Sequence, residues 1–199
     1  MPRLDRARLA PDPIEQFARW WEEAESEVPL RDAMTLATVD EAGHPDARMV
    51  LLKGFDERGF RFFTNYESQK AAQLDSAGWA ALVVYWREQD RQVRVRGRVE
   101  RLGAAESDEY FATRPRESQL GAWASPQSRR LADRGELDTR VAAVVERFGE
   151  GAIPRPEHWG GFLVHHEQVE FWQGQVGRLH DRFRYERQGS GWSVERLAP

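Results

Sequence analysis

The stretch Arg48-Met49-Val50-Leu51-Leu52-Lys53 is an apolar run with one cation at each end. A short apolar run between turn sequences is typical of a strand buried on both faces, so we expect Met49 to Leu52 to be covered. Because side chains alternate along a strand, Arg48 and Lys53 are expected to face opposite sides and to bind two different anions. The alternative interpretation is a pair of strand-end charges that only improve solubility.

Further β-rich runs, separated by turn sequences, lie on both sides of this stretch. They predict strands at 34–39, 47–55, 60–64, 79–86, 91–102, 159–166, 169–173, 183–187 and 192–196. Helices are predicted at 13–26 and 68–77, and in an insert at about 104–148 that is broken at Arg114-Pro115. The predicted fold class is mainly β with a helical insert (α+β), the strands forming a small antiparallel barrel.

Length and composition predict one folded domain and exclude several classes of protein. The chain has 199 residues, and we expect an N-terminal segment and helix at 1–28 and a single domain at 29–199. The lack of cysteine excludes disulfides and thiolate chemistry and favours the cytoplasm. A net charge of −4 argues against a nucleic-acid partner, and no apolar run is long enough to span a membrane.

Motifs for P-loops, dinucleotide binding, serine hydrolysis and zinc proteolysis are absent from the sequence. The adjacent His165 and His166 would point to opposite faces of a strand, so no metal site is predicted. Among 29 basic residues, only Lys53 and Lys70 are lysines. These two positions are therefore candidates for sites that need a compact ammonium group.

A predicted strand at 60–64 runs through Asn65 into a predicted helix that begins near Ser68. The N-terminus of a helix favours an anion such as phosphate, because its backbone N–H groups are unpaired and its dipole is positive there. Lys70 lies in this first turn, where the dipole disfavours a cation unless an anion is bound beside it. An ordinary exposed helix residue is the alternative.

Two more polar clusters follow along the chain. Tyr110, Arg114 and Ser118 are spaced four apart around Pro115, and two hydroxyls with one guanidinium suit a phosphate monoester. A surface position is the alternative for this trio. Arg178, His180 and Arg182 share one face if the backbone is extended, an arrangement that is costly without an anionic partner.

Six motifs occur in the order found in one known family. They are Arg-x-Val-Leu-Leu-Lys at 48–53, Arg-Pro-Arg-x-Ser-Gln at 114–119, Gly-Ala-Trp at 121–123, Gln127-Ser128, Glu-Phe-Trp-Gln-Gly at 170–174 and Arg-Leu-His-Asp-Arg-Phe at 178–183. With this ordered set, nearly the whole chain resembles the pyridoxamine/pyridoxine 5′-phosphate oxidase family, flavoproteins with the antiparallel FMN-binding split-barrel fold.

The resemblance implies which residues hold the ligands. FMN would be held by Arg48, Met49, Val50, Leu51, Leu52, Lys53, Phe63, Thr64, Gln69, Lys70, Gln92, Gln127, Ser128, Trp172 and Arg182. The substrate would be held by Lys53, Tyr110, Arg114, Ser118, Arg178 and His180, of which Arg178 and His180 would act in catalysis. Gln69 departs from the family pattern, in which an arginine often precedes the lysine, and leaves one fewer charge for the FMN phosphate.

The resemblance also implies the reaction. Pyridoxamine or pyridoxine 5′-phosphate would be oxidised to pyridoxal 5′-phosphate, with dioxygen as acceptor and hydrogen peroxide as product, in a homodimer with FMN at the subunit interface. One alternative is a split-barrel oxidase for another substrate, such as a phenazine precursor, which the set Tyr110, Arg114 and Ser118 disfavours. The other is a non-enzymatic flavin carrier, in which Arg178 and His180 would have no purpose.

Overall fold

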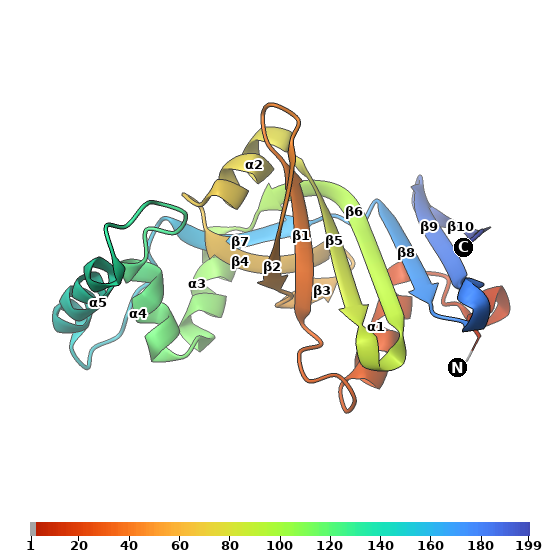
Figure 1. The fold of residues 1–199 in the computed structure, drawn as a ribbon, viewed down its shortest axis with the longest axis horizontal. Coiled ribbons are helices and arrows are strands. Elements are labelled where there is room, and N and C mark those ends of the chain that lie inside the picture. The colour runs from red at the N-terminus through yellow and green to blue at the C-terminus, as the bar shows by residue number, and fades with distance from the viewer. Residues whose placement is uncertain (1–2) are drawn as a thin grey trace.

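The computed structural model describes residues 3–199 (Figure 1). Its strands are β1 (Ala33–Val39), β2 (Pro45–Leu51), β3 (Gly54–Asp56), β4 (Gly59–Asn65), β5 (Trp79–Trp86), β6 (Arg91–Arg101), β7 (Trp159–Val164), β8 (Gln168–Gln173), β9 (Asp181–Gln188) and β10 (Gly191–Leu197). Its α-helices are α1 (Pro13–Ala24), α2 (Gln69–Ala77), α3 (Ala104–Thr113), α4 (Arg116–Ala124) and α5 (Arg134–Phe148). Three short 3-10 helices are η1 (Arg6–Arg8), η2 (Arg87–Gln89) and η3 (Val176–Arg178).

One curled antiparallel sheet contains these strands. The main path runs β10-β9-β8-β6-β5-β1-β2, while β7 pairs with both β4 and β6. The long strand β6 therefore belongs to both parts of the sheet, and it changes partner near Gly97. A Cβ atom at Gly97 would lie 1.7 Å from the carbonyl oxygen of His165, so only glycine allows this close crossing. The predicted antiparallel, mainly β fold with a helical insert is confirmed.

Helix α1 starts as the sequence predicts and closes one side of the core. The Asp12 side chain accepts a hydrogen bond from the Ile14 N–H at 2.7 Å, and Pro13 occupies the first turn. The ring of Phe17 lies 5.8 Å from that of Trp86, and the ring of Trp20 lies 5.1 Å from that of Phe171. The N-terminal helix thus shares one hydrophobic core with the strands.

The predicted strand at 47–55 is wrong in its length, because the chain changes partner after Leu51. The Leu52 N–H donates to the carbonyl of Asp32, whereas the next N–H, of Lys53, donates to the carbonyl of Arg61. The chain therefore leaves β1 and joins β4 through the short strand β3. Lys53 lies between two strands, so the alternation argument that separated it from Arg48 does not apply.

The expectation that Met49 to Leu52 is covered on both faces is also wrong for the single chain. Strand β2 is the last in the sheet order and pairs with β1 alone, so its other edge is open among residues 3–199. Met49 is 61% exposed and Leu51 is 46% exposed. Only Leu52, which follows the strand, is fully buried.

The shared extended face of Arg178, His180 and Arg182 is a third prediction that the structure overturns. Residues Val176–Arg178 form a 3-10 turn in which Gly177 and Arg178 have φ angles of +71° and +63°. Strand β9 starts only at Asp181. The physical reason is that β8 and β9 are antiparallel neighbours, so the chain between them must reverse direction.

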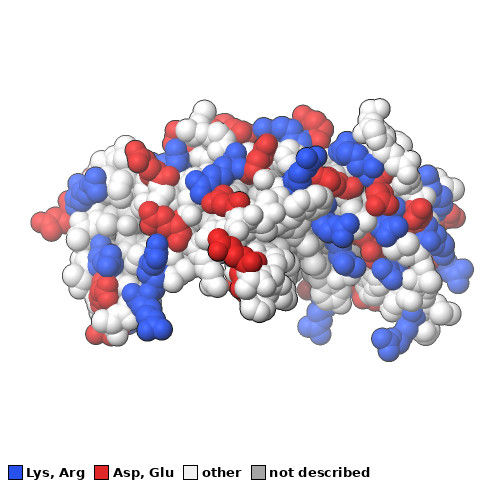
Figure 2. Space-filling view, turned by 90° about the horizontal axis from the view of Figure 1, so that it is seen from above, with Lys and Arg blue, Asp and Glu red and all other residues white. Residues whose placement is uncertain are grey.

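Figure 2 shows one face of the molecule, on which groups of both signs of charge occur. The exposed arginines of β6 lie on a solvated face, where Arg94 lies 3.5 Å from Glu170 and Arg98 lies 2.7 Å from Glu167. Among residues 3–199, no helix is both long and apolar enough to cross a membrane.

Candidate functional site

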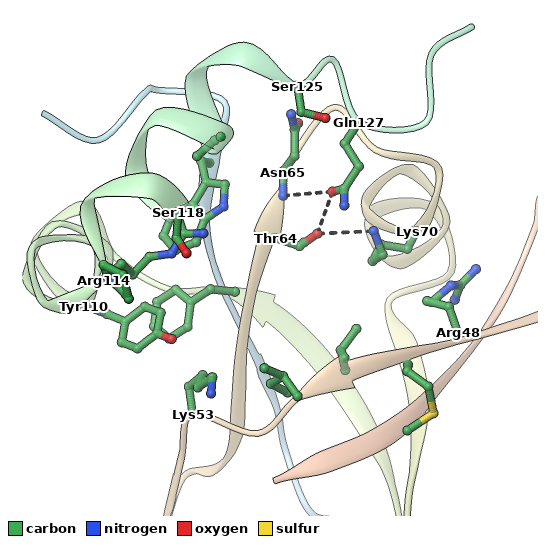
Figure 3. Close-up of a pocket in the computed structure, with 18 of the residues that line it drawn as sticks. Arg48, Lys53, Thr64, Asn65, Lys70, Tyr110, Arg114, Ser118, Ser125 and Gln127 are labelled. Atoms are coloured by element: carbon green, nitrogen blue, oxygen red, sulfur yellow. Dashed lines mark hydrogen bonds between the residues drawn. The ribbon is translucent and has the colours of Figure 1, made fainter. Parts of the chain in front are cut away.

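A cavity of about 770 Å³ lies between β2, β4 and the helical insert (Figure 3). Its volume is in the range of small-molecule and cofactor sites. Its lining consists of Arg48, Met49, Val50, Leu51, Lys53, Phe63, Thr64, Asn65, Lys70, Tyr110, Thr113, Arg114, Pro115, Ser118, Gly121, Ala122, Ser125, Gln127 and Trp159.

Lys70 forms one end of the cavity, in the first turn of α2. Its ammonium donates to the hydroxyls of Thr64 at 3.3 Å and Ser68 at 3.4 Å. Burial lowers the pKa of Lys70, and the nearby Arg48 lowers it further. No carboxylate pairs with this half-buried ammonium among residues 3–199, so an anionic ligand fits beside it.

A hydrogen-bond chain continues from Lys70 to the loop after α4. The Thr64 hydroxyl donates to Oε1 of Gln127 at 3.1 Å, and the Asn65 N–H donates to the same oxygen at 3.4 Å. The next residue, Ser128, has a φ angle of +71° and is not part of the cavity lining. The end of β4 and this loop are thereby held together at the Lys70 end (Figure 3).

Arg48 lines the same end and is held by three polar side chains. Its guanidinium donates to the Thr38 hydroxyl at 2.6 Å, to Oε1 of Gln73 at 2.9 Å and to the carboxylate of Asp46. The hydrogen bond from Gln73 is the largest cause that lowers the pKa of Asp46, and the charge of Arg48 adds to it. Asp46 is therefore ionised at neutral pH.

Arg114 forms the opposite end of the cavity, at the break between α3 and α4. Its guanidinium stacks over the Trp159 ring at 4.5 Å, and its Nη1 is buried with no hydrogen-bond partner among residues 3–199. Burial lowers the pKa of Arg114, and no carboxylate among residues 3–199 is paired with it. A buried guanidinium that faces an aromatic ring instead of an acid keeps its donors free for an anionic ligand.

Aromatic rings form a flat wall beside Arg114. The rings of Phe63 and Tyr110 stack at 3.9 Å, and the Trp159 ring is nearly parallel to that of Phe63 at 5.6 Å. Lys53 lies below this wall in Figure 3, on a different side of the cavity from Arg48. Its ammonium is paired with the carboxylate of Asp32 at 2.7 Å.

A second group of predicted site residues lies on β8, β9 and the turn between them. The rings of Trp172 and His180 are 4.6 Å apart, and the guanidinium of Arg182 pairs with Glu170 at 2.8 Å. The Gln175 N–H donates to Nδ1 of His180 at 3.2 Å. In Figure 1, β8 and β9 lie at the opposite end of the molecule from α4.

The single chain thus brings together only part of the predicted site. The cavity gathers the predicted residues Arg48, Met49, Val50, Leu51, Lys53, Phe63, Thr64, Lys70, Tyr110, Arg114, Ser118 and Gln127. Outside its lining are Leu52, Gln69, Gln92, Ser128, Trp172, Arg178, His180 and Arg182. The roles of all these residues stay predictions.

Sequence reasoning missed several residues of the cavity. Trp159 was expected only as the start of a strand, although its ring supports Arg114. Asn65 and Ser125 also line the cavity, as do Thr113, Pro115, Gly121 and Ala122. Two motifs are the available signals: Arg-Pro-Arg-x-Ser-Gln at 114–119 contains Pro115, and Gly-Ala-Trp at 121–123 contains Gly121 and Ala122, so together they cover three of these seven residues.

Comparison with protein families identifies the group to which the chain is related. Residues 20–148 match the family described as pyridoxamine 5′-phosphate oxidase. The chain belongs to this family. Residues 159–199, which include β8 and β9, match the region described as the pyridoxine 5′-phosphate oxidase C-terminal dimerisation region.

Individual members of the family cover nearly the whole chain. The pyridoxine/pyridoxamine 5′-phosphate oxidase of Salinibacter ruber is 54% identical over 98% of this chain and 93% of that protein. The protein of the same name from Synechocystis is 52% identical over 98% of this chain and 92% of that protein.

Solved structures share the fold. The structure of PhzG from Burkholderia lata in complex with tetrahydrophenazine-1-carboxylic acid matches with a TM-score of 0.92 at 32% identity, over 98% of both chains. A pyridoxamine 5′-phosphate oxidase-related, FMN binding protein from Nostoc punctiforme matches with a TM-score of 0.75 at 20% identity, over 94% of this chain and 98% of that one. The second likeness is one of fold alone.

Proposed function

We propose that this chain is an FMN-dependent oxidase that converts pyridoxamine 5′-phosphate and pyridoxine 5′-phosphate to pyridoxal 5′-phosphate. The 4′ amine or alcohol is oxidised to the aldehyde, and dioxygen is reduced to hydrogen peroxide. The relatives at 52–54% identity carry this activity in their names. When bound, FMN supplies the two-electron acceptor for the oxidation.

One observation carries the proposal: Lys70 and Arg114, two half-buried cations that have no carboxylate partner in the part of the chain that the structure describes, lie at opposite ends of one cavity. The cofactor and the substrate each carry a phosphate. Lys70, Thr64 and Gln127 form a polar cluster suited to the FMN phosphate. Arg114, Tyr110, Ser118 and Lys53 supply a guanidinium, two hydroxyls and an ammonium for the substrate phosphate.

We further propose that two copies of the chain form each complete site, with FMN at their interface. The exposed Met49 and Leu51 of edge strand β2 support this proposal, since apolar side chains on an open edge favour a partner surface. The dimerisation region at 159–199 contains Trp172, Arg178, His180 and Arg182, which the cavity of one chain lacks. In the dimer, these groups of one copy cover the cavity of the other and exclude water from it.

His180 acts as a hydrogen-bond donor at the substrate rather than as a base. Its Nδ1 accepts the Gln175 N–H, so the proton of the neutral ring lies on Nε2. Nε2 then donates to a substrate oxygen or nitrogen and orients the 4′ carbon. Arg178 lies two residues away in the same exposed turn and supplies positive charge beside it.

An absorption spectrum tests the function directly. The purified protein is expected to show a flavin band that bleaches when pyridoxamine 5′-phosphate is added without oxygen and returns when air is admitted. Hydrogen peroxide and pyridoxal 5′-phosphate are expected in equal amounts. A flavin band that pyridoxamine 5′-phosphate and pyridoxine 5′-phosphate both leave unchanged contradicts the proposal.

The phenazine-type alternative is less well supported. The PhzG structure shares the fold at 32% identity, whereas the pyridoxine/pyridoxamine 5′-phosphate oxidases share 52–54%. The cavity also presents Arg114 together with Tyr110 and Ser118, a set that matches a phosphate better than a lone carboxylate. A flavin that is reduced by a dihydrophenazine carboxylate but not by pyridoxine 5′-phosphate favours the alternative.

A further inference from the structure

The carboxylate of Asp46 stands out because, although it is outside the lining, it contacts Arg48 at one end of a cavity that suits anions. Asp46 and Arg48 are two residues apart on β2, so their side chains lie on the same side of the strand. The carboxylate contacts the Arg48 guanidinium and also accepts the side-chain N–H of Gln73 at 3.2 Å. Its side chain is 37% exposed, whereas that of Arg48 is 20% exposed.

The guanidinium N–H groups of Arg48 are therefore already hydrogen-bonded to other side chains of the same chain. Its guanidinium donates to Asp46, Gln73 and Thr38, all of which lie outside the cavity lining. Lys70 is the contrasting cation: among residues 3–199, its ammonium donates to the hydroxyls of Thr64 and Ser68 and is in direct contact with no carboxylate. Figure 3 shows Arg48 and Lys70 on the same side of the cavity.

The net formal charge at the Arg48–Lys70 end is therefore smaller than the charge of its two cations. Arg48 and Lys70 contribute two positive charges, and Asp46 removes one of them. Gln69, at the start of α2, adds none. A phosphate bound at this end meets one net positive charge, and it must compete with Asp46 for the donors of Arg48.

We propose that Asp46 is an internal counter-ion of Arg48 that weakens the binding of the FMN phosphate at the Arg48–Lys70 end of the cavity. The inference rests on the proposed function, because it takes the phosphate of FMN as the anion. Asp46 is on this account an affinity-determining residue that sets how readily the apoprotein loads its cofactor. If Asp46 instead orients Arg48 towards the phosphate, removal of the Asp46 charge weakens FMN binding.

The test compares Asp46→Asn with the unchanged chain by titrating apoprotein with FMN and with riboflavin, which lacks the phosphate. Asparagine keeps the size of the side chain and an acceptor oxygen but removes the charge. The dissociation constant of FMN is expected to fall about three- to tenfold, whereas that of riboflavin stays the same. Inorganic phosphate is expected to compete better with FMN in the variant, and added salt is expected to reduce the difference.

Glu41→Gln is the matched control, because it removes the same charge from the exposed turn of the same β1–β2 hairpin. Its FMN affinity is expected to match that of the unchanged chain. Asp46→Ser removes the same charge and serves as a second variant, so the test does not depend on the folding of Asp46→Asn alone.

Three outcomes overturn the inference: FMN binding that is unchanged in Asp46→Asn, FMN binding that is weaker, or a gain that riboflavin shares. Failure of the proposed function is distinguishable from these outcomes, because it is read in a separate assay: the bound flavin of the unchanged chain is then reduced by neither pyridoxamine 5′-phosphate nor pyridoxine 5′-phosphate.

Discussion

Two cations of the cavity, Lys70 and Arg114, differ in their partners from the arginines of β9, whereas Arg48 and Lys53 of the same cavity are paired with Asp46 and Asp32. In the cavity, Lys70 and Arg114 have no carboxylate partner among residues 3–199. On the outer strands, Arg182 pairs with Glu170 at 2.8 Å, and Arg184 pairs with Glu195 at 3.0 Å. Both regions contain residues that the sequence predicts as ligand-binding, so residue type alone does not separate them.

The difference separates binding charges from structural charges. A half-buried cation without an acid is costly, and the cost is recovered only when an anion binds. A cation paired across neighbouring strands instead stabilises the sheet and has little charge left for a ligand. We therefore expect the cavity to determine phosphate affinity, and the β8–β9 region to contribute orientation and cover.

The largest expected effect is that of Arg114→Ala. Loss of the unpaired guanidinium removes charge-assisted hydrogen bonds of about 1.5–3 kcal/mol, so kcat/KM for pyridoxine 5′-phosphate is expected to fall about 100-fold. The bound FMN, measured by its absorbance, is expected to stay near one per chain. Arg140→Ala is the control, because Arg140 pairs with Glu136 on the surface of α5. An unchanged KM in Arg114→Ala contradicts the distinction between cations that bind a ligand and cations that are paired within the sheet.

Substitutions in the turn before β9 are expected to act on turnover instead. Arg178→Ala is expected to retain FMN but to lose at least about tenfold in kcat/KM, equivalent to about 1.4 kcal/mol of transition-state stabilisation. His180→Asn is expected to lose less, because the amide still donates a hydrogen bond. Anaerobic stopped-flow measures flavin reduction by saturating pyridoxine 5′-phosphate. Reduction at the unchanged rate in both variants contradicts the assignment.

The two lysines sharpen the comparison within the cavity. Lys70→Met is expected chiefly to weaken FMN, since among residues 3–199 its ammonium contacts hydroxyls and pairs with no carboxylate. Lys53→Met is expected to raise KM for the phosphorylated substrate while most FMN binding survives, by a smaller factor because Asp32 already pairs with Lys53. Each variant is the control for the other, in an FMN titration and in kinetics at saturating FMN. If both variants lose flavin equally and neither changes KM, the assignment of the two lysines to different phosphates is contradicted.

The smallest expected effect concerns the free energy of unfolding at acidic pH, which depends on the buried His166. His166 is buried beside Trp192 and Arg187, and burial lowers its pKa from 6.5 to about 4. The unfolded chain therefore binds this proton first, and stability is lost as the pH falls from about 6.5 towards about 4, by up to about 1.4 kcal/mol per pH unit. His166→Gln is expected to flatten that slope in urea unfolding. A slope equal to that of the unchanged chain contradicts the assignment to His166.

The sequence predicted the elements well wherever the pattern is local. The helix at 13–26 follows from Asp12 and Pro13, and the break at Arg114-Pro115 is observed between α3 and α4. Local patterns failed where the chain changes partner. The end of β2 at Leu51 depends on a switch from β1 to β4, which is a contact between segments far apart in sequence.

The candidate site could be predicted in its composition but not in its grouping. The motifs identified the residues of both regions, yet nothing in them separates Arg114, which has no acid partner within the described chain, from Arg182, which has one. Partners such as Asp46 for Arg48 come from the folded arrangement of β2 and α2. The support of Arg114 by Trp159 likewise depends on a contact across 45 positions, which no spacing rule contains.

The central claim is that one chain supplies the cavity and the other supplies the β8–β9 groups, and subunit complementation tests it most directly. Arg114→Ala and Arg178→Ala are co-expressed, and the mixed dimers then contain one intact site and one doubly altered site. With random pairing, activity is expected to recover to about a quarter of that of the unchanged protein. Arg114→Ala with Lys70→Met, both in the cavity, is expected to recover none. No recovery in the first mixture, under conditions in which mixed dimers are shown to form, contradicts the account.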